Sequence, residues 1–152
     1  MIILALVCGC GYSHIASTTC TFNQPTPLVA SAQDGVRHGP LNLEIIRHMD
    51  TVMSGPDVEE DQLLTLEVRN FRLNQKILVP SPNIKTHFTT RRSGPEAEGR
   101  TFSGFLIVRS VGSNQVTINL HLVVNASTSD NRYAQTLKYR GDYRFYREDS
   151  PL

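Results

Sequence analysis

The chain contains little of what marks several large classes of protein. Its 152 residues include no tryptophan, and its three cysteines, Cys8, Cys10 and Cys20, all lie near the N-terminus. The remaining residues can therefore form neither a disulfide-stapled domain nor a zinc site built from thiolates. The net charge of +1 lacks the basic excess typical of nucleic-acid-binding domains, so we expect no nucleic-acid partner. No apolar run approaches the roughly 20 residues that a membrane-spanning helix needs.

Catalytic and metal-binding motifs are missing from the sequence as well. It has no Gly-x-Ser-x-Gly elbow, no phosphate-binding loop and no dinucleotide fingerprint. Its five histidines show no metal-ligand spacing. The acidic run at 57–61 lacks the alternating ligands and the turn glycine of a calcium loop, so we expect a solvated loop there. We therefore expect no metal ion, no cofactor and no catalytic residue that the sequence alone identifies.

The N-terminus carries the most specific signal in the sequence. Residues 2–7 are uncharged and apolar, and they lead into a Val-Cys-Gly-Cys sequence that ends at Cys10. This segment resembles the lipobox of bacterial lipoproteins, in which a small residue precedes a cysteine that becomes the lipidated first residue of the mature chain. The resemblance implies an export signal over residues 1–10, with Gly9 as the small residue and Cys10 as the acylated one. The basic region that opens such signals is missing here.

Two other interpretations of this segment stay open. It is also consistent with an ordinary cleaved secretory signal without a lipid, or with the first apolar strand of an intracellular domain. Without a lipid, Cys10 could pair with Cys20 in a disulfide.

The next segment, residues 11–40, is rich in Ser, Thr, Pro and Gly and has few large apolar side chains. Such a segment buries too little surface to offset the entropy lost on ordering. We therefore predict a flexible tether over residues 11–40, with an ordered but irregular arm as the alternative. The folded part of the chain is then a single β-rich domain over residues 41–152.

Strand patterns dominate that domain. Residues 116–124 alternate apolar and polar side chains, which indicates a half-buried strand. The apolar segment 101–111 precedes it across a polar Gly-Ser-Asn turn, and residues 134–146 alternate in the same way. We expect these segments to form a C-terminal three-stranded antiparallel meander, with Gly141 marking a bulge or a close backbone approach. Further strand patterns lie at 64–68, 76–79 and 84–90.

The pattern as a whole predicts a mainly β fold, either an antiparallel β-sandwich or a small β-barrel. Residues 41–53 are ambiguous, because Leu41, Ile45 and Met49 suit one face of a helix. Leu41, Leu43 and Ile45 equally suit a strand. We favour a short helix over 41–53, starting after the proline at position 40.

A basic patch is the strongest candidate binding surface. Lys138, Arg140 and Arg144 fall on the polar face of the last strand, and further arginines lie in the loop before the meander. The patch comprises Lys138, Arg140, Arg144, Arg91, Arg92 and Arg100. Two basic groups on one side suit an anionic partner such as a lipid headgroup, a polysaccharide or an acidic protein. The alternative is an edge strand whose charges prevent pairing with other sheets.

These observations predict a non-enzymatic exported lipoprotein of the cell envelope. It would be anchored to the membrane through Cys10, would face the periplasm or the exterior, and would use its β domain for binding or assembly with an envelope protein or a polysaccharide. Secretion without an anchor is the second choice. One alternative is a small secreted hydrolase or an accessory domain of one, with His87 or His121 acting beside Glu67 or Asp142. Another is an intracellular β domain.

Overall fold

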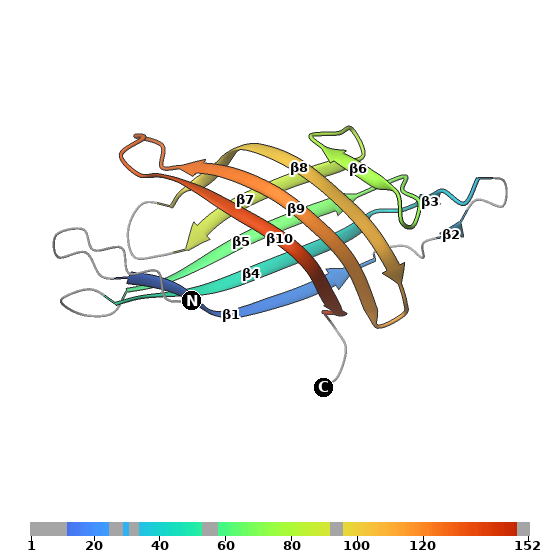
Figure 1. The fold of residues 1–152 in the computed structure, drawn as a ribbon, viewed down its shortest axis with the longest axis horizontal. Coiled ribbons are helices and arrows are strands. Elements are labelled where there is room, and N and C mark those ends of the chain that lie inside the picture. Colours follow the sequence, from blue (N-terminus) through green and yellow to red (C-terminus); the bar gives the residue numbers. More distant parts are fainter. Residues whose placement is uncertain (1–11, 25–28, 31–33, 53–57, 92–95, 149–152) are drawn as a thin grey trace.

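The computed structural model describes residues 12–24, 29–30, 34–52, 58–91 and 96–148 (Figure 1). All regular structure in these ranges is β, in ten strands. The strands are β1 (Tyr12–Asn23), β2 (Val29–Ala30), β3 (Arg37–His38), β4 (Leu41–Val52), β5 (Val58–Val68), β6 (Lys76–Val79), β7 (Ile84–Arg91), β8 (Glu98–Val111), β9 (Gln115–Ser127) and β10 (Ala134–Arg147).

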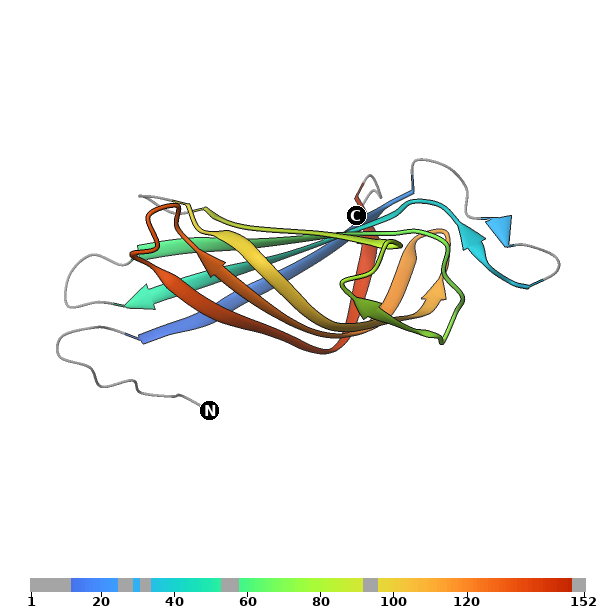
Figure 2. The same cartoon turned by 90° about the horizontal axis from the view of Figure 1, so that it is seen from above.

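The strands close into a barrel, which decides between the two predicted architectures. Seven of them follow one another around the wall in the order β8-β7-β5-β4-β1-β10-β9, and β9 pairs back with β8. β6 pairs with β8 as an extra strand, and β2 with β3 forms a separate two-stranded ribbon. Figures 1 and 2 show β8, β9 and β10 crossing over the flatter layer of β1, β4, β5 and β7. All pairings are antiparallel except that between β1 and β10.

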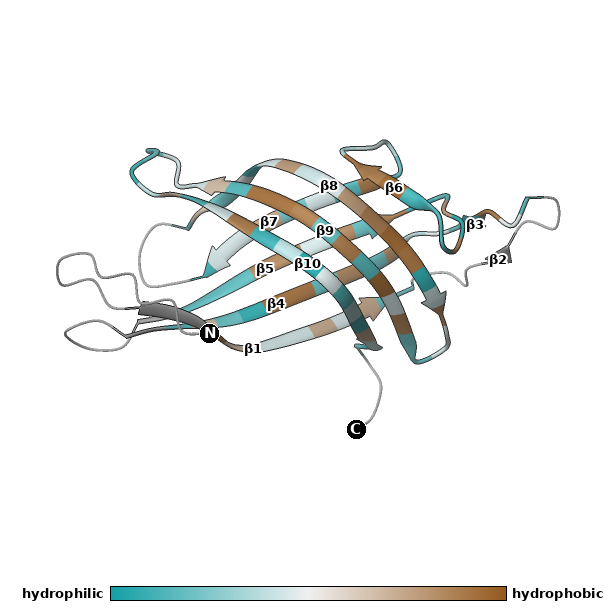
Figure 3. Cartoon of the chain, in the orientation of Figure 1, coloured by the Kyte–Doolittle hydropathy of each residue, from teal (hydrophilic) through white to brown (hydrophobic). Residues whose placement is uncertain are grey.

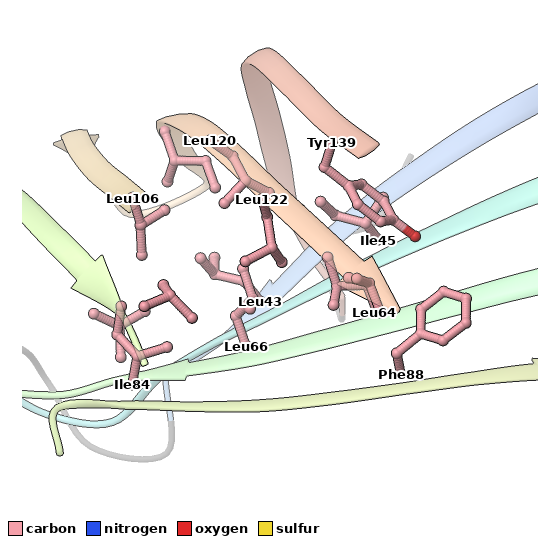
Figure 4. Close-up of a cluster of buried hydrophobic side chains, with 14 of the residues drawn as sticks. Leu43, Ile45, Leu64, Leu66, Ile84, Phe88, Leu106, Leu120, Leu122 and Tyr139 are labelled. Carbon is pink, nitrogen blue, oxygen red and sulfur yellow. The ribbon is translucent and has the colours of Figure 1, made fainter. Parts of the chain in front are cut away.

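The barrel interior is filled with apolar side chains. In β9 every second residue is buried, from Val116 to Ala126, and the residues between them face outward. The same alternation places Leu43, Ile45 and Leu64 in the interior. Figure 3 shows the resulting apolar bands, and Figure 4 shows the side chains of opposite walls meeting in one cluster. The barrel is therefore a packed core rather than an open channel over this length.

The predicted C-terminal meander is confirmed. β8, β9 and β10 pair antiparallel, and the Gly112 amide donates to the carbonyl oxygen of Gln115 (2.8 Å) in the first turn. The prediction for Gly141 was wrong, because its pairing with β9 continues without a shift and a side chain there would meet no atom within 4 Å. Gly141 instead has a backbone φ of +123°, a value that residues with a side chain rarely adopt. The close backbone approach is at Gly104, where a Cβ atom would lie 1.9 Å from the His121 carbonyl oxygen.

The favoured helix over 41–53 was wrong, since Leu41–Val52 is strand β4 in the centre of the flatter layer. Leu41, Leu43 and Ile45 are all buried, whereas Asn42 and Glu44 between them are not. The strand interpretation explains this burial, and a helix would not. Pairing with β1 on one side and β5 on the other outweighs the helical spacing, which is a weak signal over so short a segment.

The tether predicted for residues 11–40 was wrong for residues 12–23, which form β1 of the barrel wall. From Ile15 to Asn23, where side-chain burial is described, most side chains are exposed and only Phe22 is fully buried. Residues 1–11, with the predicted signal and Cys10, lie outside the described residues. Cys20 is a free thiol. The alternative disulfide between Cys10 and Cys20 also involves a residue outside the described ranges.

The wall is incompletely closed where the first and last strands meet. β1 and β10 pair in parallel only at Thr21 with Tyr146 and Phe22 with Arg147. Beyond these pairs the two strands diverge toward the N-terminal end of β1, as both Figure 1 and Figure 2 show. We call this unpaired boundary, between residues 15–19 of β1 and residues 138–144 of β10, the seam.

Candidate functional site

The outer face of β10 carries a row of free cations. Lys138, Arg140 and Arg144 are exposed and alternate along the strand. Asp142, between them, accepts a hydrogen bond from Asn119 Nδ2 on β9 (2.9 Å). Among the described residues, no carboxylate lies within ion-pairing distance of the three cations. By contrast, several other arginines are engaged: for example, Arg69 binds Glu67 at 2.6 Å.

The predicted patch of six residues divides in the structure. Arg100 lies near the first residue of β8. Its Nε donates to Ser127 Oγ (3.2 Å), and its Nη1 lies 3.7 Å from Glu98 Oε2. Arg91 ends β7, on the opposite side of the barrel, in register with Asp61. Arg92 lies outside the described residues. The structure therefore brings together only the three cations of β10.

A stack of side chains that the sequence analysis missed extends this surface across the meander. The Phe105 and His121 rings stack with centroids 4.6 Å apart, and Lys76 Nζ lies 4.3 Å from the centre of the Phe105 ring. His121 is the cross-strand partner of Arg140. We call Lys138, Arg140 and Arg144, with the adjoining Lys76–Phe105–His121 stack, the basic face.

Arg47 is a second feature that the sequence analysis missed. It follows Ile45 on the core-facing side of β4, and its guanidinium lies 3.7 Å from the centre of the Tyr139 ring. It donates hydrogen bonds to the Lys138 carbonyl oxygen and to Tyr143 Oη, both at 3.0 Å. Burial raises the pKa of Tyr139, although Arg47 partly opposes the shift, so the phenol stays neutral. Arg47 therefore links β4 to β10 across the seam.

The interior around Arg47 is polar, unlike the rest of the core. Gln62 and Thr90 are buried there, and Thr90 Oγ1 accepts the Ala97 amide (2.9 Å). Among the residues that the structure describes, three buried polar atoms have no hydrogen-bond partner: Glu60 Oε1, Gln135 Nε2 and Tyr139 Oη. Figure 4 shows the Tyr139 hydroxyl directed away from Leu106 and Ile84, toward this end of the barrel. Unsatisfied buried groups of this kind lower stability.

The histidine and carboxylate pairs proposed for a hydrolase do not form in the described structure. His121 is stacked on Phe105, and Asp142 is bound by Asn119. His87 and Glu67 line one groove of about 390 Å³ on the outer face of β1, β4, β5 and β7, but Glu67 is held by Arg69. No hydrogen bond between a proposed histidine and its carboxylate is present in the described ranges.

One histidine does contact a carboxylate. His48 Nδ1 lies 2.5 Å from Asp61 Oδ1, and Nε2 lies 3.7 Å from Asp50. All three side chains are more than a third exposed on the outer surface. Such a pair can orient an imidazole, but catalysis also needs a nucleophile or a bound substrate beside it.

Within the described ranges, no group of three His, Cys, Asp or Glu side chains is placed to hold a metal ion. The same ranges contain no helix with the length and hydropathy needed to cross a membrane. Comparison of the chain with protein-family models, with curated proteins and with solved structures found no match.

Proposed function

We propose that this protein is a non-enzymatic binding barrel of the cell envelope that holds an anionic partner on its basic face. The observation that carries the proposal is the row of unpaired cations, Lys138, Arg140 and Arg144, on the outer face of one strand. The three cations outnumber the one carboxylate among them, Asp142, so this face carries a net positive charge that an anionic partner would offset. The candidate partners are an envelope protein with an acidic surface and an acidic polysaccharide.

The packed interior supports an outer binding site. Leu43, Leu64 and Leu120 from different walls are each at most 2% exposed, so the middle of the barrel has no room for a ligand. A ligand of any size would have to bind outside or at an end. The rigid meander suits this role, because three paired strands fix the spacing of the cations.

Membrane anchoring remains part of the proposal. An acylated Cys10 would stand only two residues before Tyr12, the first residue of β1, and two residues span at most about 7 Å. The lipid would therefore hold the barrel against the membrane surface instead of at the end of a long tether. Each buried CH₂ of the acyl chains contributes roughly 0.8 kcal/mol to this attachment.

Binding of alginate, a polyuronate, tests the basic face. The variant carries Lys138→Gln, Arg140→Gln and Arg144→Gln together. The matched control carries Arg72→Gln, Lys85→Gln and Arg132→Gln, three exposed cations elsewhere with the same change in net charge. Exposed ion pairs contribute about 0.5 kcal/mol each, so we expect about tenfold weaker binding for the β10 variant only. Equal loss in both variants would show that net charge, and not the basic face, attracts the polymer.

Intact mass of the protein from its native membrane fraction tests the anchor. A mature chain that begins at Cys10 with an added diacylglyceryl mass is the expected result, and Cys10→Ser should release the protein from the membrane. An unprocessed chain that begins at Met1 would contradict both export and anchoring.

A hydrolase remains the second candidate, because the groove near β7 is lined by both His87 and Glu67. Replacing His87 and His121 with alanine would abolish any ester or glycoside hydrolysis that depends on them. Unchanged activity in this double variant would remove the hydrolase from consideration.

A further inference from the structure

Within the described ranges, the free edge of β1 lacks the usual protection of an edge strand. Residues 15–19 are exposed on both faces of the strand, and Ile15 is 49% exposed. The segment 12–23 contains no charged residue and no proline. Natural edge strands are commonly guarded by lysine, proline or a covering segment, since an unguarded edge pairs readily with another chain.

The backbone at the seam is directed for such pairing. The Phe22 carbonyl oxygen accepts the Glu148 amide, so Phe22 faces β10. In an antiparallel ladder, residues two apart point to the same side, and both backbone groups of one residue point together. Thr18, four residues earlier, therefore presents its N–H and C=O to the seam, whereas Thr19 faces β4.

Two local distortions lie at one level of the seam. If the parallel register of Thr21 with Tyr146 continued, Ala16 would lie opposite Gly141. β1 has a register shift between Ile15 and Ser17 at this level, and Gly141 has its φ of +123°. A parallel ladder between β1 and β10 would therefore meet an irregular backbone on both strands at this level. Arg47 instead bridges the boundary by binding the Lys138 carbonyl oxygen.

Charge distinguishes between possible occupants of the seam. Lys138, Arg140 and Arg144 project from β10 on the outer side, whereas β1 contributes no charge. A strand with carboxylates on its outer face would find these cations beside it. Pairing two copies of β1 would instead bring the cations of two β10 strands toward each other.

We propose that the open edge of β1 binds an extended acidic segment of a partner protein as an added strand, whose carboxylates lie against Lys138, Arg140 and Arg144. The inference rests on the proposed function and narrows the anionic partner to a polypeptide. Backbone hydrogen bonds to β1 would supply affinity, and the cations of β10 would select acidic sequences.

The probe is a short fluorescein-labelled peptide of alternating valine and glutamate, measured by fluorescence anisotropy with the full chain. One control peptide has the same side chains but N-methylated backbone amides, which cannot donate to a strand. The other replaces glutamate with lysine. We expect the acidic peptide to bind, the methylated peptide to bind at least about tenfold more weakly, and the basic peptide not to bind.

The outcomes separate the two proposals. Equal binding of the acidic and the methylated peptides would overturn strand addition and leave the anionic face standing. If neither peptide binds while alginate still binds, strand addition is likewise overturned and the basic face remains the binding site for anions. Failure of every anion would overturn both proposals. A dimer of the free protein in analytical ultracentrifugation, with protected Thr18 amides, would show that a second copy occupies the edge and would also overturn the inference.

Two further measurements address the backbone directly. In hydrogen exchange by NMR, the Thr18 amide should exchange fast in the free protein and at least about tenfold more slowly with the acidic peptide, whereas Thr19 should be protected in both states. Thr18→Pro removes a donor from the open side only. It should abolish peptide binding and leave alginate binding intact. Unchanged Thr18 exchange in the complex would contradict strand addition without relying on any variant.

Discussion

The two ends of the barrel interior are built from the same strands but hold different chemistry. At the end where β5 leads to β6, Leu41, Val68 and Phe71 are each at most 1% exposed. At the opposite end, Arg47 lies over Tyr139, and polar atoms of Glu60 and Tyr139 are buried without partners. Alternation along a strand fixes which side chains enter the barrel, but not whether they are apolar. We infer that the apolar end contributes most of the stability and that the polar end is the weaker part.

The largest effect is expected at the apolar end. Phe71→Ala leaves a cavity in the core at this end, and large-to-small aromatic substitutions in cores cost about 3–5 kcal/mol. Urea denaturation would measure the loss in the free energy of unfolding. A loss below about 1 kcal/mol would show that this end can collapse or that its packing contributes little.

A smaller effect is expected for Arg47→Met, which keeps an apolar stem but removes the contact with Tyr139 and the bonds to Lys138 and Tyr143. Together these contacts suggest a loss of about 2 kcal/mol in the same denaturation experiment. The exposed control Arg72→Met should change the free energy of unfolding by less than about 0.5 kcal/mol. If the two variants were equally stable, the contacts of Arg47 across the seam would make no net contribution to the free energy of unfolding.

The two tyrosines of the polar end offer a matched pair. Tyr143→Phe removes the acceptor of an Arg47 hydrogen bond and should cost about 1 kcal/mol. Tyr139→Phe removes a buried hydroxyl that has no partner, so it should be neutral or stabilising. Thermal unfolding of both variants would compare them directly. A destabilised Tyr139→Phe protein would mean that the hydroxyl has a partner, such as an ordered water, in solution.

The last effect depends on pH and concerns Cys20, close to Arg47. Burial raises the pKa of Cys20 from 9.0 to about 11, and the charge of Arg47 opposes part of the shift. The unfolded chain therefore loses this proton first as the pH rises. The contribution of the thiol to stability is complete below about pH 9 and is lost progressively up to about pH 11.

The measurement is urea denaturation across this pH range in a background with Cys8→Ser and Cys10→Ser. The decline in stability should be shallower when Cys20→Ser is added, because serine does not titrate there. Parallel pH profiles for the two proteins would contradict the raised pKa.

Much of the wall could be predicted from the sequence, because its burial pattern is local. Residues 116–124 and 134–146 alternate regularly, so their strands and the meander were recognised directly. The basic residues of β10 were placed on the exposed side for the same reason. The sequence could not discriminate between a sandwich and a barrel, because that difference depends on which strands pair across long separations in the chain.

The failures have a common cause in β1 and β4. Residues 15–19 of β1 are exposed on both faces, so they show no alternation, and only pairing with β4 makes them a strand. In β4, Ile45 and Ile46 are adjacent, and this obscures the alternation of the strand. If residues 41–52 are taken as a strand, Arg47 shares the core-facing side with Ile45. The sequence then indicates a polar position inside the barrel. The stack of Phe105 with His121 required knowledge of the register between β8 and β9.

The parallel pairing of Thr21 with Tyr146 has a consequence for biogenesis. The ring is completed by β1 and β10, so a nascent chain cannot close the wall until β10 has left the ribosome. Such distant contacts also form slowly. The wall would therefore stay open through much of synthesis and would close in a late step of folding.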